Sequence, residues 1–174
     1  MADPLVRRRD FVIGMGAISG LAASTSKLSA DERVFGVRRS RGDVRLNATC
    51  DLAFPAIAAA SMPEVLVIGD GAPGVRMRGR ADLGESLAGA GYVELRRYRF
   101  DRDEDRVRAR EVFVRAGIQP LLTGESGDFL FGFKTLGSRE KAWREIIVEP
   151  QWVGLRAQLQ DVAIYKTRSD AVCA

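Results

Sequence analysis

The residues best suited to chemistry lie in one alternating stretch and at two positions elsewhere. Glu94, Arg96 and Tyr98 are two positions apart, so on a β-strand they share one face. Arg38 falls in a similar arginine-rich segment, and Tyr165 lies in the last expected strand. If a pocket borders these residues, arginine can clamp a carboxylate or enolate ligand and tyrosine can donate a proton. An ordinary ion pair is the alternative, because burying either charge alone is costly.

The chain of 174 residues contains no histidine and only two cysteines, Cys50 and Cys173. The lack of histidine excludes Ser-His-Asp and Cys-His nucleophiles, histidine-ligated haem and the common mixed zinc sites. Two cysteines cannot form a metal site alone. We therefore predict no metal site and assign no cofactor or catalytic residue; any catalysis rests on carboxylates, Tyr, Lys, Arg, a cofactor or the substrate's own reactivity.

Two segments invite comparison with nucleic-acid or nucleotide sites. Residues 96–110 (RRYRFDRDEDRVRAR) are the most basic stretch but carry four acids, which indicates a solvated surface rather than a basic stripe. Residues 69–74 (GDGAPG) lack both the Gly-Lys-Ser/Thr ending and the GxGxxG spacing of phosphate loops, and we expect a hairpin turn there. We predict no nucleic-acid partner.

The first thirty residues have the pattern of an export signal. Arg8, Arg9 and Phe11 resemble the twin-arginine motif, and the apolar run 11–23 would span only about 20 Å as a helix, too short for a stable membrane span. We expect cleavage after residue 30 and a periplasmic or extracellular mature chain. In that oxidising setting a Cys50–Cys173 disulfide could form, although Cys173 lies at a chain end, where fraying is common.

The second half of the chain alternates strands and helices. Residues 91–100 alternate as a strand, residues 101–117 have helical spacing that ends at Gly117, and residues 118–136 form two apolar strands around an ESGD turn. Ser138 can cap a following helix, and Pro150 interrupts it, so that Trp143 and Trp152 can face the same sheet. Residues 161–167 supply a last strand. This order is the split βαβ arrangement of a ferredoxin-like α+β fold.

The apolar strand near residue 130 indicates a barrel. Phe129, Phe131 and Phe133 share one face, while Leu130 and Gly132 share the other. A sheet covered by helices on one side needs only one apolar face, so the second face predicts another sheet against it. We expect an α+β barrel with a pocket, closed either within the chain or by a homodimer.

A degenerate repeat would supply the second sheet. Arg38, Arg39 and Arg41 recur 58 positions later as residues 96, 97 and 99, and the segments 64–71 and 119–126 then align around a glycine. Chance similarity between short apolar strands is the alternative. Residues 42–63 resemble no motif or family pattern that we recognise.

The segments YVELRRYRF, RAGIQPLL and REKAW…EPQW resemble the NIPSNAP family, which implies a ferredoxin-like domain of the dimeric α+β barrel group and no established catalytic set. The expected organisation is a signal peptide (1–30), a degenerate repeat (31–90), a NIPSNAP-like domain (91–168) and a tail (169–174). The expected function is binding of a small apolar or anionic ligand, or of a protein partner. A small cofactor-independent oxygenase or isomerase, and an assembly module with no ligand, are the alternatives.

Overall fold

The architecture was determined from a computed structural model that describes residues 31–41, 52–60, 64–70 and 72–167. These residues form eight strands and four helices. In chain order they are β1 (Glu32–Ser40), β2 (Leu52–Ala58), β3 (Val65–Asp70), β4 (Val75–Arg80), α1 (Leu83–Ala88), β5 (Tyr92–Tyr98), α2 (Asp103–Arg115), β6 (Leu122–Gly124), β7 (Asp128–Phe133), α3 (Leu136–Ile147), α4 (Trp152–Arg156) and β8 (Leu159–Lys166).

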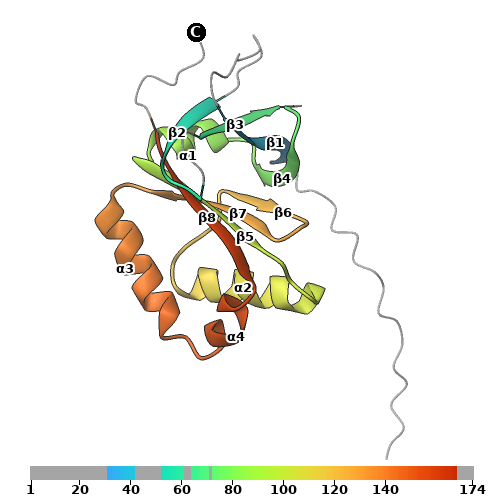
Figure 1. Cartoon of the computed structure of the whole chain (residues 1–174), viewed down its shortest axis with the longest axis vertical. Coiled ribbons are helices and arrows are strands. Elements are labelled where there is room, and N and C mark those ends of the chain that lie inside the picture. Colours follow the sequence, from blue (N-terminus) through green and yellow to red (C-terminus); the bar gives the residue numbers. More distant parts are fainter. Residues whose placement is uncertain (1–30, 42–51, 61–63, 71, 168–174) are drawn as a thin grey trace, which may run out of the picture.

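The strands form one closed barrel in the order β1-β3-β2-β8-β5-β7-β6-β4 (Figure 1). Every neighbouring pair is antiparallel. Contacts between β2 and β8 and between β4 and β6 join the two halves of the chain. The α+β class and the barrel are therefore confirmed, and of the two expected routes to closure the barrel uses the one within a single chain.

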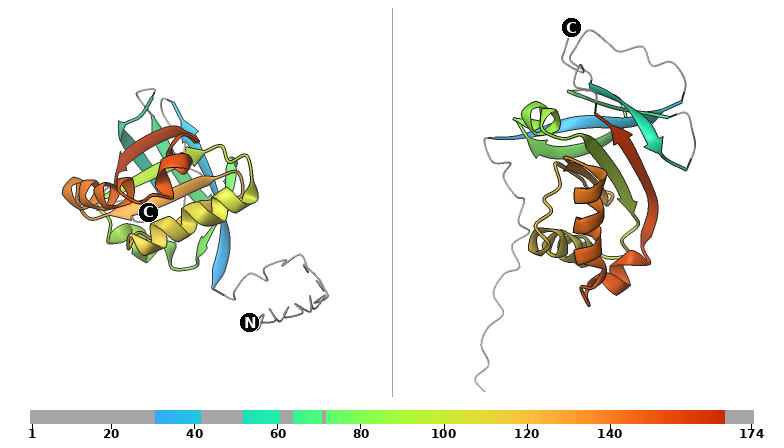
Figure 2. Two further views of the ribbon diagram at one scale, coloured as in Figure 1. Left: turned by 90° about the horizontal axis from the view of Figure 1, so that it is seen from below. Right: turned by 90° about the vertical axis from the view of Figure 1, so that its left-hand side faces the viewer.

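Three helices cover one outer face of the barrel. The views in Figure 2 place α2, α3 and α4 against the sheet of β5, β7 and β8. Aromatic side chains fill the layer between them, and Phe113 of α2 lies at its centre with ring contacts to Tyr98, Phe129, Phe131, Trp143 and Trp152. The face of β7 that carries phenylalanines is thus the helix-covered face.

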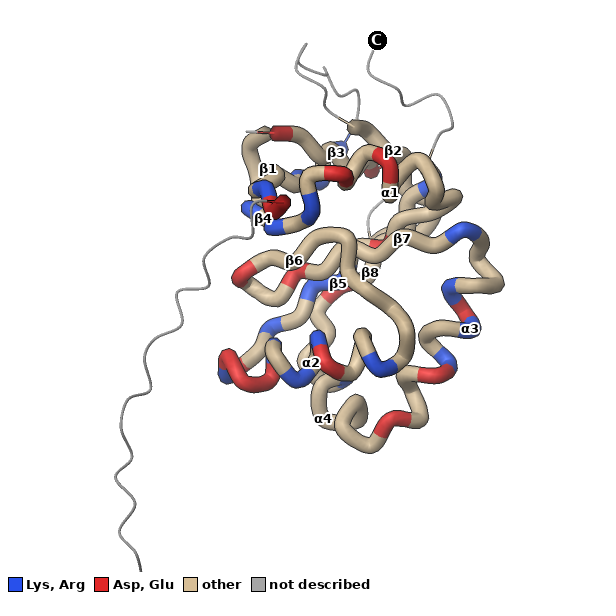
Figure 3. Tube along the Cα trace, turned by 180° about the vertical axis from the view of Figure 1, so that it is seen from behind, with Lys and Arg blue, Asp and Glu red and all other residues tan. Residues whose placement is uncertain are grey.

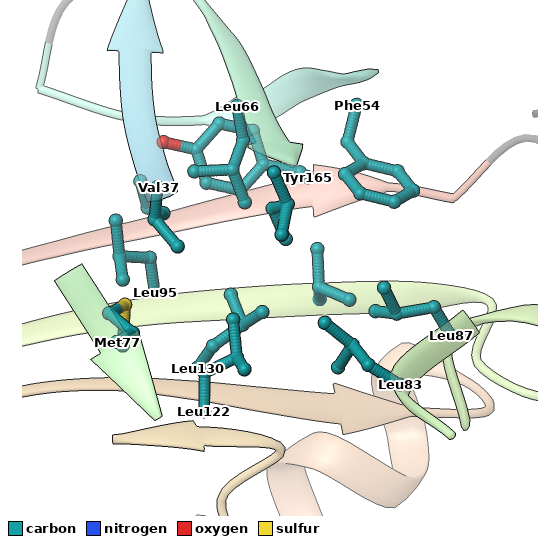
Figure 4. Close-up of a cluster of buried hydrophobic side chains, with 13 residues drawn as sticks. Val37, Phe54, Leu66, Met77, Leu83, Leu87, Leu95, Leu122, Leu130 and Tyr165 are labelled. Carbon is teal, nitrogen blue, oxygen red and sulfur yellow. The ribbon is translucent and has the colours of Figure 1, made fainter. Parts of the chain in front are cut away.

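The barrel interior forms a second apolar core. Along each strand, residues that point into this core alternate with residues that point outward. Val93 and Leu95 of β5 and Leu130 of β7 point into it. Leu83 and Leu87 of α1 close one end, and Figure 4 shows them at the opposite end of this core from Val37 and Met77. The interior is packed at the α1 end, with Leu83 and Leu87 among its buried residues.

The tryptophan helices confirm the predicted break. α3 ends at Ile147, α4 begins at Trp152, and the rings of Trp143 and Trp152 lie 6.2 Å apart with both side chains buried. The cap differs from expectation: Thr135 is the N-cap and accepts from the Ser138 backbone N–H, while the Ser138 hydroxyl accepts from the Thr135 backbone N–H. Ser138 is therefore the reciprocal member of a capping box rather than the cap itself.

The expected hairpin around residues 69–74 is wrong. β3 and β4 do not pair with each other; each pairs with a different edge of β1, so the connection crosses over β1. Gly36 and Gly74 make the crossing possible, because a Cβ at Gly36 would lie 1.8 Å from the Ala72 carbonyl oxygen and Gly74 has a φ of +139°. The apolar runs were identified as strands, but their pairing was not a local one.

None of the described helices is both long enough and apolar enough to cross a membrane. Arg8, Arg9, Phe11 and the Cys50–Cys173 pair lie outside the described residues.

Candidate functional site at the open barrel mouth

A pocket of about 550 Å³ opens at the barrel end opposite α1. β4 begins beside Val37, so Arg38 and the following residues of β1 extend past it and pair with β3 alone. Apolar side chains of Val37, Val75, Met77 and Leu95 contribute to its lining. The charged residues that line the pocket are Arg38, Arg39, Arg41, Glu64, Arg97, Asp128 and Asp161.

Arg39 is the centre of a buried polar network. Its Nε and one terminal nitrogen donate to the two carboxylate oxygens of Glu64 at 2.7 and 2.8 Å, and the other terminal nitrogen donates to Asp161. The Tyr165 hydroxyl, inside the barrel, donates to Glu64 as well. Figure 4 shows the Tyr165 ring among the barrel side chains. Two-point binding of this kind fixes the guanidinium plane.

The network moves two pKa values away from neutrality. Burial alone would raise the pKa of the Glu64 carboxyl, but the hydrogen bonds from Arg39 and Tyr165 outweigh it and hold that pKa below its usual value. Burial, assisted by the hydrogen bond to Glu64, raises the pKa of the Tyr165 hydroxyl well above its usual value. At neutral pH Glu64 is therefore ionised and Tyr165 is protonated.

Arg97 reaches the same pocket from β5 with fewer partners. Its Nε donates to Asp128 at 2.9 Å, and the Asp128 carboxylate also accepts from Ser126. The side chain of Arg97 remains 43% exposed, whereas that of Asp128 is 3% exposed. The terminal nitrogens of Arg97 have no hydrogen-bond acceptor in the part of the chain that the structure describes.

Arg38 is the least compensated charge of the pocket. It belongs to no ion pair among the described residues, and its Nε is buried without a hydrogen-bond partner there. Buried polar groups in proteins are nearly always hydrogen-bonded, so an exception needs an explanation. A bound ligand that supplies a hydrogen-bond acceptor would explain the unsatisfied Nε of Arg38.

Three of the five site residues predicted from the sequence lie outside the pocket. Glu94, Arg96 and Tyr98 occupy the helix-covered face of β5 rather than the pocket side. Glu94 is fully buried and accepts from Arg96 Nε and Arg139 Nε at 2.5 Å each and from Trp143 Nε1 at 2.9 Å. The Arg96 guanidinium also lies 3.3 Å from the Trp143 ring centroid, a cation–π contact. This arrangement is the ion-pair alternative of the sequence analysis.

Tyr98 belongs to the aromatic layer. Its ring contacts Phe100, Phe113, Phe129 and Trp152, and burial raises the pKa of its hydroxyl to about 12. Of the five predicted residues, Arg38 and Tyr165 are the two that belong to the barrel mouth, Arg38 in the pocket lining and Tyr165 through Glu64.

Sequence reasoning missed the three acids of the pocket lining and three of its arginines, Arg39, Arg41 and Arg97. The available signal was the alternation of each strand: Arg39 follows Val37, and Arg97 follows Leu95, by the two positions that keep side chains on the barrel-facing side.

Outside the barrel, acidic and basic residues are interspersed along α2 and α3 (Figure 3).

Comparisons with protein-family models, with curated proteins and with solved structures found no match to this chain.

Proposed function

We propose that this protein binds a small anionic molecule with an apolar part in the pocket at the barrel mouth. The observation that carries the proposal is Arg38, an arginine in a pocket wall whose Nε is buried and lacks an acceptor among the described residues. A carboxylate fits this arginine because the planar guanidinium presents paired donors that match two carboxylate oxygens.

Arg97 adds a second donor on the opposite half of the barrel. Among the described residues only its Nε is engaged, by Asp128, and Arg97, whose side chain is 43% exposed, lines the same pocket. Arg39, in contrast, is held by two carboxylates. The pocket thus offers Arg38 and Arg97 to a ligand and uses Arg39 for its own architecture.

The apolar lining supplies the other half of the recognition. Val37, Met77 and Leu95 belong to the barrel core and also border the pocket, so an apolar tail can continue the core toward the mouth. The volume of about 550 Å³ is in the range of small-molecule sites, which combine apolar walls with a few placed polar groups. A small ligand is therefore favoured over a protein partner.

The enzyme alternative, an oxygenase or isomerase, has weaker support. Proton transfer is most efficient when the catalytic pKa is near the working pH. The network shifts the pKa of Glu64 down and that of Tyr165 up, away from neutrality. Both groups are suited to holding Arg39 in place.

A ferredoxin-like tandem origin of the barrel is part of the same proposal. Around the barrel, the first half has the order β2-β3-β1-β4 and the second half has β6-β7-β5-β8, which is the same second-third-first-fourth order in both. This order supports a duplication in which β3 corresponds to β7, not to β6 as the sequence alignment suggested. The NIPSNAP relationship, export through residues 8–12 and any homodimer are proposals that rest on the sequence alone.

Calorimetric titration of the full chain with three eight-carbon ligands tests the function. We expect octanoate to bind at least about ten-fold more tightly than octanol, a difference of about 1.4 kcal/mol, and octylammonium to bind more weakly still. Equal affinity for all three would remove the role of the arginines. Failure of all three to bind would overturn the proposed function.

A further inference from the structure

The two arginines that point into the mouth from β1 and β5 have unequal surroundings. Arg39 and Arg97 each follow a barrel-core residue by two positions, Val37 and Leu95, and each lines the pocket. Arg39 is 18% exposed and is bound by Glu64 and Asp161, while Arg97 is 43% exposed and is bound by Asp128. The difference between them is one carboxylate, that of Asp161.

Asp161 reaches Arg39 from a distant part of the barrel. In strand register Asp161 lies directly beside Arg97, its partner across the β5–β8 pair. Its carboxylate nevertheless accepts from Arg39 of β1, although β3 and β2 separate β1 from β8 around the barrel. The side chain therefore spans the mouth and leaves its neighbouring arginine to Asp128.

This placement makes Asp161 an internal substitute for a ligand anion. Arg39 would otherwise present a terminal nitrogen to the pocket, as Arg97 does. Glu64 already binds one edge of the Arg39 guanidinium, through hydrogen bonds from Nε and one terminal nitrogen. Asp161 binds the other terminal nitrogen, so each of the three guanidinium nitrogens of Arg39 already donates to a carboxylate, and a second anionic group would have to compete with Asp161.

The carboxylates of the lining lead to the same conclusion. Among the described residues, Glu64, Asp128 and Asp161 line the pocket beside the arginines that they bind. A second anionic group of a ligand would lie near these carboxylates, and an uncompensated charge in a partly buried site is unfavourable.

We infer that Asp161 restricts the pocket to ligands with a single negative charge, so that monocarboxylates with an apolar tail bind and dicarboxylates and phosphate monoesters do not. The inference rests on the proposed function, and it names the class of ligand and the residue that selects it. Removal of the Asp161 charge should open a second anion position at Arg39.

Octanoate and octanedioate, which have the same chain length and differ in one carboxylate, test the inference by calorimetry on the full chain. The wild type should bind octanoate at least about ten-fold more tightly than octanedioate. Asp161→Asn should bind octanedioate at least about ten-fold more tightly than the wild type does, with a smaller change for octanoate. Asp82→Asn is the matched control, since Asp82 pairs with Arg80 on the surface outside the pocket lining, and it should leave both affinities unchanged.

The outcomes separate the inference from the proposed function. No octanoate binding by the wild type would overturn both. Octanoate binding with equal octanedioate affinity would overturn the inference alone, and so would an Asp161→Asn variant that folds yet gains nothing for octanedioate. If Asp161→Asn does not fold, the selectivity of the wild type remains decisive, and Asp161→Ser provides a second variant with the same expected gain.

Discussion

Arg38 and Arg39 are adjacent on β1 and have opposite electrostatic surroundings. Arg39 donates to Glu64 at two points and to Asp161, whereas Arg38 has a buried Nε with no acceptor among residues 31–41, 52–60, 64–70 and 72–167. Both line the same pocket. One arginine is therefore held by its neighbours, while the other is the arginine that the proposed function assigns to the ligand, and substitutions at the two positions should have different effects.

Arg39→Met should destabilise the fold. Among the described residues, Glu64, whose side chain is 3% exposed, would keep only the Tyr165 hydroxyl as a hydrogen-bond partner of its carboxylate. Loss of one member of a buried ion pair costs about 3 kcal/mol or more. Urea unfolding followed by circular dichroism measures this change. A loss under about 0.5 kcal/mol, typical of ordinary surface substitutions, would show that the network contributes little.

Stability should fall in acid through Glu64. The pKa of its carboxyl in the folded protein is below the usual 4.5, so its contribution is complete above that value and is lost as the pH falls through the lower, folded-state pKa. The difference in unfolding free energy between wild type and Glu64→Gln should therefore be largest near neutral pH and shrink below about pH 4. A difference that stays constant over this range would exclude the linkage.

The crossing over β1 predicts opposite effects for two Gly→Ala changes. Gly36→Ala would force a Cβ to within 1.8 Å of the Ala72 carbonyl oxygen, so the chain must shift, at a cost of about 1–3 kcal/mol or more. Gly84→Ala in α1 meets no atom within 4 Å and should stabilise the helix by about 0.5–1 kcal/mol. Thermal unfolding of both variants measures the contrast, and a tolerated Gly36→Ala would contradict the crossing.

Substitution of the two tryptophans, Trp143 and Trp152, provides a matched comparison for the hydrogen bond to the buried Glu94. Trp143 Nε1 donates to Glu94, while the Trp152 side chain makes no hydrogen bond within the described part of the chain, although both rings are buried in the same aromatic layer. Trp143→Phe should therefore cost about 1 kcal/mol more than Trp152→Phe, because it also leaves a buried carboxylate with one donor fewer. Equal losses in urea unfolding would show that packing alone sets the role of Trp143.

Much of the second half of the fold could be predicted from local patterns. Helical spacing that ends at Gly117, the ESGD turn and the break at Pro150 each constrain the backbone by themselves, and the observed α2, β6–β7 hairpin and α3–α4 pair follow them. The first half was harder because its pairing is non-local. β3 and β4 flank β1, and no local signal in residues 69–74 distinguishes that crossing from a hairpin.

The site was predicted only in part, for a physical reason. The polar face of β5 was assigned to the pocket, yet its apolar face lines the barrel, and Glu94 and Arg96 are satisfied by Arg139 and Trp143 from α3. Partners 45 or more positions away along the chain are not visible in a strand pattern. The barrel-mouth arginines follow from alternation, but the acids that bind them come from other strands.

The most direct test of the account is the paired measurement of octanoate affinity and stability for Arg38→Met. The variant replaces a guanidinium that has no ion-pair partner among the described residues with an apolar side chain of similar length, so octanoate should bind at least about ten-fold more weakly. The free energy of unfolding should stay unchanged or rise by up to about 1 kcal/mol, because the buried unsatisfied Nε is removed. Arg78→Met, on the outer face of β4, is the control and should leave the affinity unchanged. Unchanged octanoate affinity in Arg38→Met would contradict the central claim that this arginine holds the ligand.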